Sequence, residues 1–222
     1  MELILDTGNI KEIEDLYLHL PIDGVTTNPS IVSKEGKPLD KLIKEIDSII
    51  DEDTAIHAQV LSKDYEGIIE EAKYISSLRN NIYVKIPVTK EGLRAIRDLK
   101  KQGLKITATA IFTAHQGFLA AKAGADYIAP YVNRIDNISA DGVGVVRDLI
   151  KIIDVYNMNT KVLAASFKNT QQVISLMTSG IQSVTVPADI CKAMINHPLT
   201  EWSVDKFIDD WEKTYNHSKL LK

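Results

Sequence analysis

The stretch IYVKIPVT, residues 82–89, contains the repeating unit on which the fold is built. Val84 and Ile86 are β-branched residues, which favour a short strand that is buried on both faces. Thr89 follows at a position suited to cap a helix. Lys85 interrupts the apolar run, and a buried ammonium group needs a partner or a function because its desolvation costs free energy. The stretch therefore predicts a strand and a following helix, with one charged side chain that requires explanation.

Similar β-branched runs recur along the whole chain, and amphipathic segments such as Ile10/Ile13/Tyr17/Leu20 separate them. The eight predicted strands are LILDT (3–7), GVTTN (24–28), IHAQV (56–60), IYVKIP (82–87), KITATAIF (105–112), YIAPYV (127–132), KVLAASF (161–167) and SVTVP (183–187). This alternation, at about 28 residues per unit, is typical of an α/β protein with a (β/α)8 TIM barrel. We therefore expect a single barrel domain over residues 1–222, with an open doubly wound sheet as the alternative.

The ends of the predicted helices carry their own signals. Asn9 and Glu12 are spaced as a capping box, and Gly103, Gly124 and Gly180 are placed to end helices. Residues 199–222 add a C-terminal amphipathic helix and tail, with an apolar stripe made of Trp202, Val204, Phe207, Ile208, Trp211 and Tyr215. This helix is expected either to close the bottom of the barrel or to pack on a neighbouring subunit.

The composition narrows the classes of partner and compartment. The 26 basic and 30 acidic residues are interspersed and give a net charge of −4, so no nucleic-acid partner is expected. MELILDTGN lacks the pattern of a signal peptide and no apolar run approaches ~18 residues, so we expect no membrane association and a cytoplasmic location. The single cysteine, Cys191, lies in an apolar pattern that favours a buried structural thiol over a nucleophile.

Polar side chains occur in nearly every predicted strand, which a core built only for stability would not need. They are Asp6, Thr26, Asn28, Gln59, Lys85, Thr107, Thr109, Tyr131 and Ser166. Each could be a satisfied core group by itself, but buried polar groups cost free energy without partners. In a barrel they can all face one cavity, so we predict that they form a common site.

The sequence is compatible with two roles for Lys85. It could be a structural lysine that snorkels or pairs with Asp6. Alternatively it forms a Schiff base with a carbonyl substrate, because burial disfavours the ammonium and raises the neutral fraction above the one in ~2,500 expected for an ordinary lysine at pH 7.

Four motifs, in order along the chain, resemble those of a known family. GVTTNPSI (24–31), the lysine in VKIP (84–87), APYVNRID (129–136) and LAASFK (163–168) are similar to the transaldolase family, in the small single-domain branch that includes fructose-6-phosphate aldolase. The resemblance covers essentially the whole predicted barrel. It implies a homo-oligomer, as pentamer rings or a decamer, in which the last helix reaches a neighbour.

The resemblance also implies roles for the candidate residues. Lys85 matches the Schiff-base lysine, Asp6 and Asn28 match residues that bind the dihydroxyacetone portion, and Thr109 matches a position that helps to hold a catalytic water. Arg134, Ser166 and Lys168 match the phosphate site, and Thr26 is expected beside them in the substrate site. Two alternatives stay open: Arg134 could pair with Asp136, and Lys168 could simply be solvated.

Two further residues separate the branches of the family. Transaldolases carry glutamate where this chain has Gln59 and phenylalanine where it has Tyr131, so the resemblance favours the aldolase branch. Glutamine cannot exchange a proton as a carboxylate does, whereas Tyr131 can act through a water shared with Gln59 and Thr109. A structural role is the alternative for each.

The expected activity is the reversible cleavage of fructose 6-phosphate to dihydroxyacetone and glyceraldehyde 3-phosphate. A transaldolase that passes the three-carbon unit to erythrose 4-phosphate and a non-catalytic sugar-phosphate-binding barrel are the alternatives. No cofactor is expected, and no metal either, because the chain shows no His, Cys or Asp cluster at ligand spacing.

Overall fold

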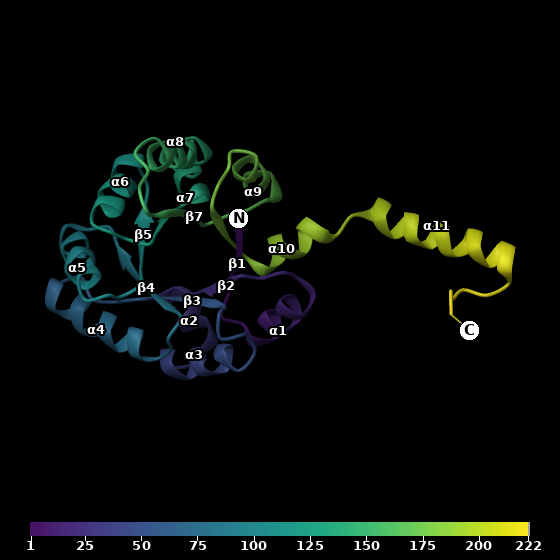
Figure 1. Cartoon of the computed structure of the whole chain (residues 1–222), viewed down its shortest axis with the longest axis horizontal. Coiled ribbons are helices and arrows are strands. Elements are labelled where there is room, and N and C mark those ends of the chain that lie inside the picture. The colour runs from purple at the N-terminus through teal and green to yellow at the C-terminus, as the bar shows by residue number, and fades with distance from the viewer. Residues whose placement is uncertain (222) are drawn as a thin grey trace.

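A closed barrel of eight parallel strands forms the centre of the molecule, with strands β1 to β8 paired in chain order and β8 paired with β1 (Figure 1). It is seen in a computed structural model that describes residues 1–221. The strands are β1 (Glu2–Asp6), β2 (Gly24–Thr26), β3 (Ala55–Gln59), β4 (Ile82–Pro87), β5 (Ile106–Ile111), β6 (Tyr127–Pro130), β7 (Lys161–Ala164) and β8 (Ser183–Val186). The predicted TIM barrel is confirmed, and the open doubly wound sheet is wrong.

Helices surround the barrel and follow the strands. They are α1 (Ile10–His19), α2 (Pro29–Glu35), α3 (Leu39–Asp47), α4 (Tyr65–Ser77), α5 (Lys90–Lys100), α6 (Ala114–Lys122), α7 (Val132–Asp136), α8 (Gly142–Val155), α9 (Thr170–Met177), α10 (Ala188–Ile195) and α11 (Pro198–Tyr215). The apolar faces of these helices, except that of α11, pack on the outer faces of the strands and form one large core.

The predicted helix signals are largely confirmed. Thr89 caps α5, since its side chain accepts a hydrogen bond from Gly92 N. Gly103, Gly124 and Gly180 adopt positive φ after α5, α6 and α9, as glycine does most readily. Asn9 caps α1, although the capping box itself is incomplete.

The difference lies in the partner of Glu12. Its carboxylate accepts a hydrogen bond from Thr7 Oγ1 at 2.6 Å, while Asn9 N donates to Thr7 Oγ1 at 3.2 Å. Thr7 therefore takes the place that the reciprocal bond of a capping box would have.

Three predicted strands, β2, β6 and β7, end two or three residues earlier than expected, at the edge that carries the candidate site. Asn28 lies beyond β2 and caps α2, Tyr131 lies beyond β6 and precedes α7, and Ser166 lies beyond β7. Their side chains are thus placed by the first residues of the loops and helices, at the carboxyl ends of the strands. This is the end of a TIM barrel where active sites form.

The opposite end of the barrel interior is filled by aromatic rings. The rings of His57 and Tyr83 stack at 4.9 Å, and Tyr127 meets both edge-on at 5.1 and 5.0 Å. Ile4 and Leu163 complete this inner core. The barrel interior is therefore filled by side chains below the carboxyl ends of the strands.

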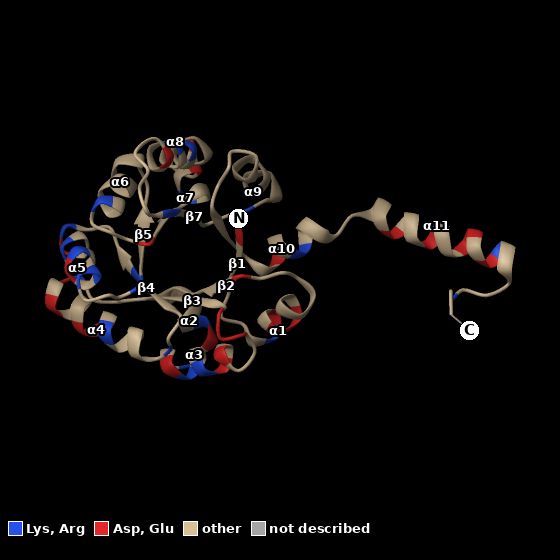
Figure 2. Ribbon diagram, in the orientation of Figure 1, with Lys and Arg blue, Asp and Glu red and all other residues tan. Residues whose placement is uncertain are grey.

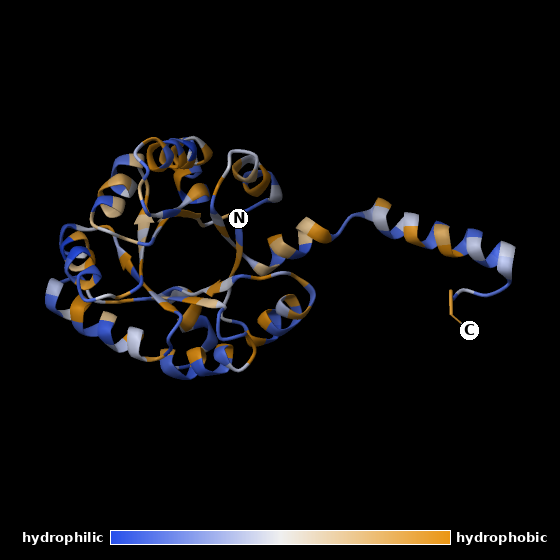
Figure 3. Cartoon of the chain, in the orientation of Figure 1, coloured by the Kyte–Doolittle hydropathy of each residue, from blue (hydrophilic) through white to orange (hydrophobic). Residues whose placement is uncertain are grey.

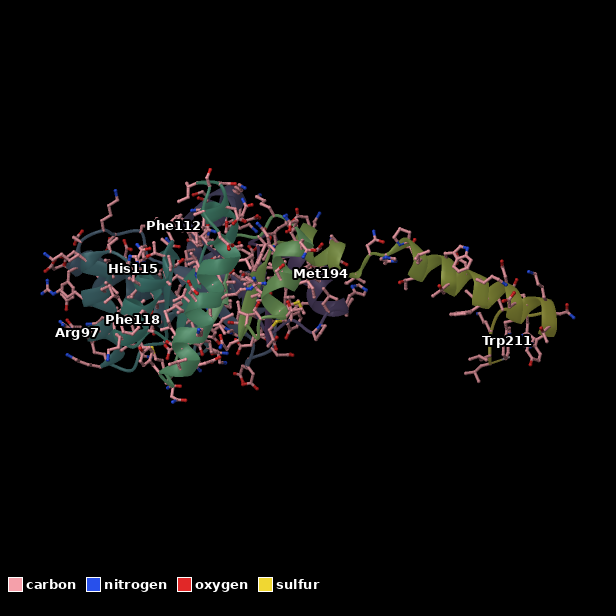
Figure 4. The ribbon with its side chains drawn as sticks, turned by 90° about the horizontal axis from the view of Figure 1, so that it is seen from above. Arg97, Phe112, His115, Phe118, Met194 and Trp211 are labelled. Carbon is pink, nitrogen blue, oxygen red and sulfur yellow. The ribbon has the colours of Figure 1, made fainter. Side chains whose placement is uncertain are left out.

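The last helix, α11, projects away from the barrel in two perpendicular views, and Trp211 lies far beyond Met194 of α10 (Figures 1 and 4). None of its residues is buried, and Trp202 and Phe207 are 63% and 70% exposed. The predicted amphipathic helix is present, but its proposed role in closing the barrel bottom is wrong. Lys222, the last residue of the predicted tail, lies outside the described residues.

Charged and apolar residues are interspersed on both the barrel helices and α11 (Figures 2 and 3). Acidic and basic residues both occur on the outer helices α3, α4 and α5 (Figure 2). Apolar and polar segments alternate along α11, and the barrel does not cover the apolar ones (Figure 3). Across residues 1–221, no helix combines the length and the hydropathy needed to cross a bilayer.

Candidate active site

Lys85 lies inside the barrel, on β4, and only 6% of the residue is exposed. Its neighbours Val84 and Ile86 point outward into the core that the helices cover. The Nζ atom donates a hydrogen bond to Thr27 O at 2.6 Å. A snorkelling lysine is therefore wrong, because the amine stays within the protein, and its direct partner is a backbone carbonyl instead of the Asp6 carboxylate.

The electrostatic surroundings of Lys85 favour the neutral amine. Burial lowers the pKa of Lys85 most, Asp6 opposes this shift and Arg134 adds to it. A lysine with a lowered pKa has a larger neutral fraction at pH 7, and only the neutral amine is a nucleophile. The lowered pKa therefore comes from the burial of Lys85 inside the barrel, and the expected effect of Val84 and Ile86 is wrong because both point to the opposite face of β4.

Asp6 ends β1 on the wall of the same cavity. Burial raises the pKa of Asp6, whereas Lys85, the hydrogen bond from Thr26 and Arg134 act in the opposite direction. Thr26 Oγ1 donates to Asp6 Oδ1 at 2.8 Å and lies 2.5 Å from Thr185 Oγ1. Thr26 is fully buried, so its hydroxyl holds Asp6 and does not itself face the cavity.

Tyr131 and Thr109 meet across the site, since their hydroxyl oxygens lie 3.0 Å apart. The register between β5 and β6 shifts between Ala108 and Ile111, and Ala110 has a φ of 57°. Such an irregularity re-aims neighbouring side chains at the rim of a barrel. The chain thus uses a strained residue next to Thr109, at the point where Thr109 contacts Tyr131.

Gln59 lies beside Lys85, because the two residues are paired in the register of β3 and β4. Its Oε1 is buried and has no hydrogen-bond partner within residues 1–221. A buried acceptor of this kind normally binds a protein group, a water or a ligand. Gln59 therefore offers a free acceptor next to the lysine.

A cavity of about 390 Å³ opens at this end of the barrel. Seven of the predicted residues line it: Asp6, Asn28, Lys85, Tyr131, Arg134, Ser166 and Lys168. Three more lie behind them: Gln59 is next to Lys85, Thr109 contacts Tyr131, and Thr26 contacts Asp6. Ten of the eleven predicted residues are thus brought together. The exception is Thr107, which is fully buried with its hydroxyl 2.8 Å from His57 Nδ1 and does not line the cavity.

The outer part of the cavity is cationic. Arg134 does not pair with Asp136, because that carboxylate accepts hydrogen bonds from Gly142 N at 2.8 Å and Gln172 Nε2 at 2.7 Å. The Arg134 guanidinium instead stacks on Tyr131, with Cζ 4.6 Å from the ring centroid. Lys168 is exposed, and Ser166 holds a φ of 64° beside it. Two cations and a hydroxyl at one rim can bind an anion such as a phosphate.

Sequence reasoning missed two residues of this region. Lys34 of α2 adds a third cation to the cavity wall, and a helix after Asn28-Pro29 would have placed it there. His57 is fully buried, and its Nδ1 lies 2.8 Å from Thr107 Oγ1. The alternation in IHAQV puts His57 on the same face as Gln59, which was the available signal.

Cys191 is the structural thiol that its surroundings predict. It is 1% exposed, and burial raises its pKa to about 11. A thiol with a raised pKa is a poor nucleophile. Cys191 therefore takes no part in the candidate site.

The fold and the site define a (β/α)8-barrel enzyme of the aldolase and transaldolase type, with a lysine at the centre of its cavity. The family profile described as "Transaldolase/Fructose-6-phosphate aldolase" matches residues 3–220. The chain belongs to this family.

Relatives and solved structures agree with the family and the fold respectively. A "Probable transaldolase" of Clostridium acetobutylicum is 40% identical over 216 residues, which are 97% of this chain and 100% of that protein. A flavocytochrome b2 variant with benzoylformate has a TM-score of 0.62 at 12% identity, over 84% of this chain. The chain spans 57% of that flavocytochrome, and this likeness shows the fold alone.

Proposed function

We propose that the protein is a class I aldolase that cleaves fructose 6-phosphate reversibly to dihydroxyacetone and glyceraldehyde 3-phosphate. The observation that carries the proposal is Lys85, an amine with a lowered pKa, buried in a cavity with Asp6 and Tyr131. The neutral amine attacks the substrate carbonyl, and loss of water gives a protonated Schiff base. This cation is the electron sink for carbon–carbon cleavage, so the proposed reaction uses neither a metal nor an organic cofactor.

Proton transfer is assigned to Tyr131 and Asp6. A water shared by Tyr131, Thr109 and the free acceptor of Gln59, or the Asp6 carboxylate itself, removes the hydroxyl proton as the bond breaks. Glyceraldehyde 3-phosphate leaves and an enamine remains on Lys85. Protonation and hydrolysis of the enamine then release dihydroxyacetone and restore the amine.

The remaining site residues bind the two ends of the substrate in this proposal. Asn28 and Asp6 hold the dihydroxyacetone portion, with Thr26 acting through its hydrogen bond to Asp6. Arg134, Ser166 and Lys168 bind the phosphate at the cationic rim. A planar guanidinium, a hydroxyl and a point charge are complementary to a phosphate dianion.

The second candidate function is a transaldolase, and the name of the 40% identical relative favours it. In that reaction the enamine attacks erythrose 4-phosphate before it can be protonated. Gln59 and Tyr131 favour the aldolase, because Tyr131 can deliver the proton that releases dihydroxyacetone.

A coupled assay of glyceraldehyde 3-phosphate release from fructose 6-phosphate, with and without erythrose 4-phosphate, separates the two functions. The aldolase releases it without the acceptor, together with an equal amount of dihydroxyacetone. Release that requires the acceptor and yields sedoheptulose 7-phosphate would overturn the assignment based on Gln59 and Tyr131.

We also propose that the chain acts in the cytoplasm as a homo-oligomer, as pentamer rings or a decamer. The support for assembly is α11, which holds Trp202, Phe207 and Leu199 in an exposed apolar face. A face of this kind normally marks a protein contact. Light scattering of the purified chain measures the subunit number, and a monomer at micromolar concentration would contradict the proposal.

A further inference from the structure

Three contacts fix the ring of Tyr131: two come from β5 and the residue that follows it, and one comes from α7. Its hydroxyl bonds to Thr109 of β5, and its ring meets Phe112 edge-on at 5.7 Å. The third contact is the guanidinium of Arg134, which lies over the ring with Cζ at 4.6 Å from the centroid. A cation over the face of a tyrosine is attracted by the ring quadrupole, so it restrains the ring.

The stack follows from the local sequence. Tyr131 precedes the first residue of α7 and Arg134 follows three positions later, which places both on one side of the helix turn. Because Asp136 is bonded to Gly142 and Gln172, its carboxylate does not draw the guanidinium away from the ring. Arg134 is exposed. It contacts the Tyr131 ring and also lines the cavity.

The same segment is tied to the phosphate rim through the backbone. Val132 N donates to Ala165 O and Asn133 N donates to Ser166 O, each at 2.9 Å. Tyr131, Arg134 and Ser166 therefore belong to one hydrogen-bonded unit. A ligand that contacts Arg134 is therefore bound by the same short segment that carries the Tyr131 hydroxyl.

We propose that Arg134 is a positioning residue for Tyr131 in addition to a phosphate-binding residue: by stacking on the ring, it keeps the phenol at Thr109 even when the substrate carries no phosphate. This inference rests on the proposed function, in which Tyr131 moves the proton. An arginine that only binds phosphate would have no effect on a substrate without phosphate. The two roles are thus separable.

The experiment uses the donor half-reaction, in which no phosphate takes part. Dihydroxyacetone forms the Schiff base with Lys85, loss of a carbon-bound proton to the base gives the enamine, and deuteration from D2O returns labelled dihydroxyacetone. Nuclear magnetic resonance measures the exchange rate at saturating and at limiting dihydroxyacetone, which gives kcat and KM. The reaction is common to the aldolase and to the transaldolase, so it does not depend on the choice between them.

We expect Arg134→Met to lower kcat for exchange by about 3- to 10-fold with KM nearly unchanged, because the loss is that of a cation–π contact at a partly exposed site. Arg134→Lys, which keeps a cation near the ring, restores part of the rate. In a Tyr131→Phe background, Arg134→Met has no further effect, because the phenol on which it acts is gone. Arg94→Met is the matched control, since Arg94 stacks on Tyr65 at 3.8 Å away from the cavity, and it leaves exchange unchanged.

Two results would overturn the inference. Unchanged exchange in Arg134→Met would leave Arg134 with phosphate binding alone, and an equal loss with and without the Tyr131 hydroxyl would mean that Arg134 acts through another group. A third result concerns the unmodified protein. If it shows neither exchange nor a borohydride-trapped adduct at Lys85, the proposed function itself is refuted, and this outcome differs from the two results for Arg134→Met.

Discussion

The two ends of the barrel interior both contain charged and aromatic residues, but they use them differently. At the amino ends of the strands, Lys161 pairs with Glu2 at 2.5 Å and Lys100 pairs with Asp126 at 2.7 Å, around the rings of Tyr83 and Tyr127. At the carboxyl ends, Lys85 is buried beneath a cationic rim and bonds to a carbonyl.

The contrast indicates that the charged residues at the amino end stabilise the fold, whereas those at the carboxyl end serve the chemistry of the site. Paired charges at one end compensate one another and leave little free energy for a ligand to gain. At the other end Asp6 faces several cations in one cavity, so the charges are only partly compensated, which costs stability and favours an anionic, carbonyl-bearing ligand. The same fold thus keeps one end closed and reactive groups at the other.

The largest effect on turnover is expected from replacement of Lys85 at the carboxyl end. We expect Lys85→Met to lower turnover of fructose 6-phosphate by at least about 10³-fold, because the variant lacks the nucleophile. The variant should remain folded with a melting temperature close to that of the unmodified protein, because removal of a buried amine offsets the loss of its hydrogen bond to Thr27 O. The coupled assay and thermal unfolding measure the two effects, and a variant that fails to fold would favour a structural lysine.

Removal of one hydroxyl tests the proton route at the carboxyl end. Tyr131→Phe should lower turnover about 10²-fold, a typical effect of losing a general acid or base, while the amount of Schiff base trapped with borohydride stays the same. Equal losses of turnover and of trapped adduct would argue that Tyr131 has no role in proton transfer.

Acidification tests the layer between the two ends, where His57 lies. Burial lowers the pKa of His57 to about 3, with a smaller effect of Lys85, whereas its ordinary value is 6.5. Between these values the unfolded chain binds a proton that the native state does not, so His57 makes stability fall as the pH decreases from about 6.5 toward 3. The slope from one such group is about 1.4 kcal/mol per pH unit.

The corresponding variant is His57→Phe, which can keep a ring against Tyr83. The unmodified protein should lose about 2 kcal/mol of unfolding free energy through His57 when the pH falls from 8 to 5, and the variant should lack this loss. Urea unfolding at both pH values measures the difference, with exposed His115→Phe as the control. Identical pH dependence in His57→Phe and the unmodified protein would mean that His57 is not kept neutral.

The smallest effect is expected at the amino end. Lys161→Met removes a half-exposed ion pair with Glu2 and should change the unfolding free energy by less than about 1 kcal/mol, with turnover unchanged. A marked loss of turnover would show that the two ends of the barrel are coupled, which would weaken the comparison.

The sequence predicts the barrel because the signal, a β-branched run followed by an amphipathic segment, is repeated eight times. It places Lys85, Asp6 and Gln59 well, because alternation along a strand fixes which face a side chain takes. It fails at the strand ends. Pro29 after Asn28 does indicate an earlier end of β2, but no residue pattern announces the left-handed φ of Ser166 or the bulge before Ile111.

The direction of α11 and the Arg134 stack are also hidden in the sequence, for different reasons. An amphipathic stripe shows that a helix has an apolar face but not which surface covers it. Arg134 could pair with Asp136 by spacing alone, and only the contacts of Asp136 with Gly142 and Gln172 decide against it.

Borohydride reduction in the presence of dihydroxyacetone, followed by peptide mapping, tests the central claim most directly. The account predicts one reduced adduct, on Lys85, with none formed by Lys85→Met and with Lys161, at the other end of the barrel, unmodified. An absent adduct, or an adduct that maps to another lysine, would contradict the account.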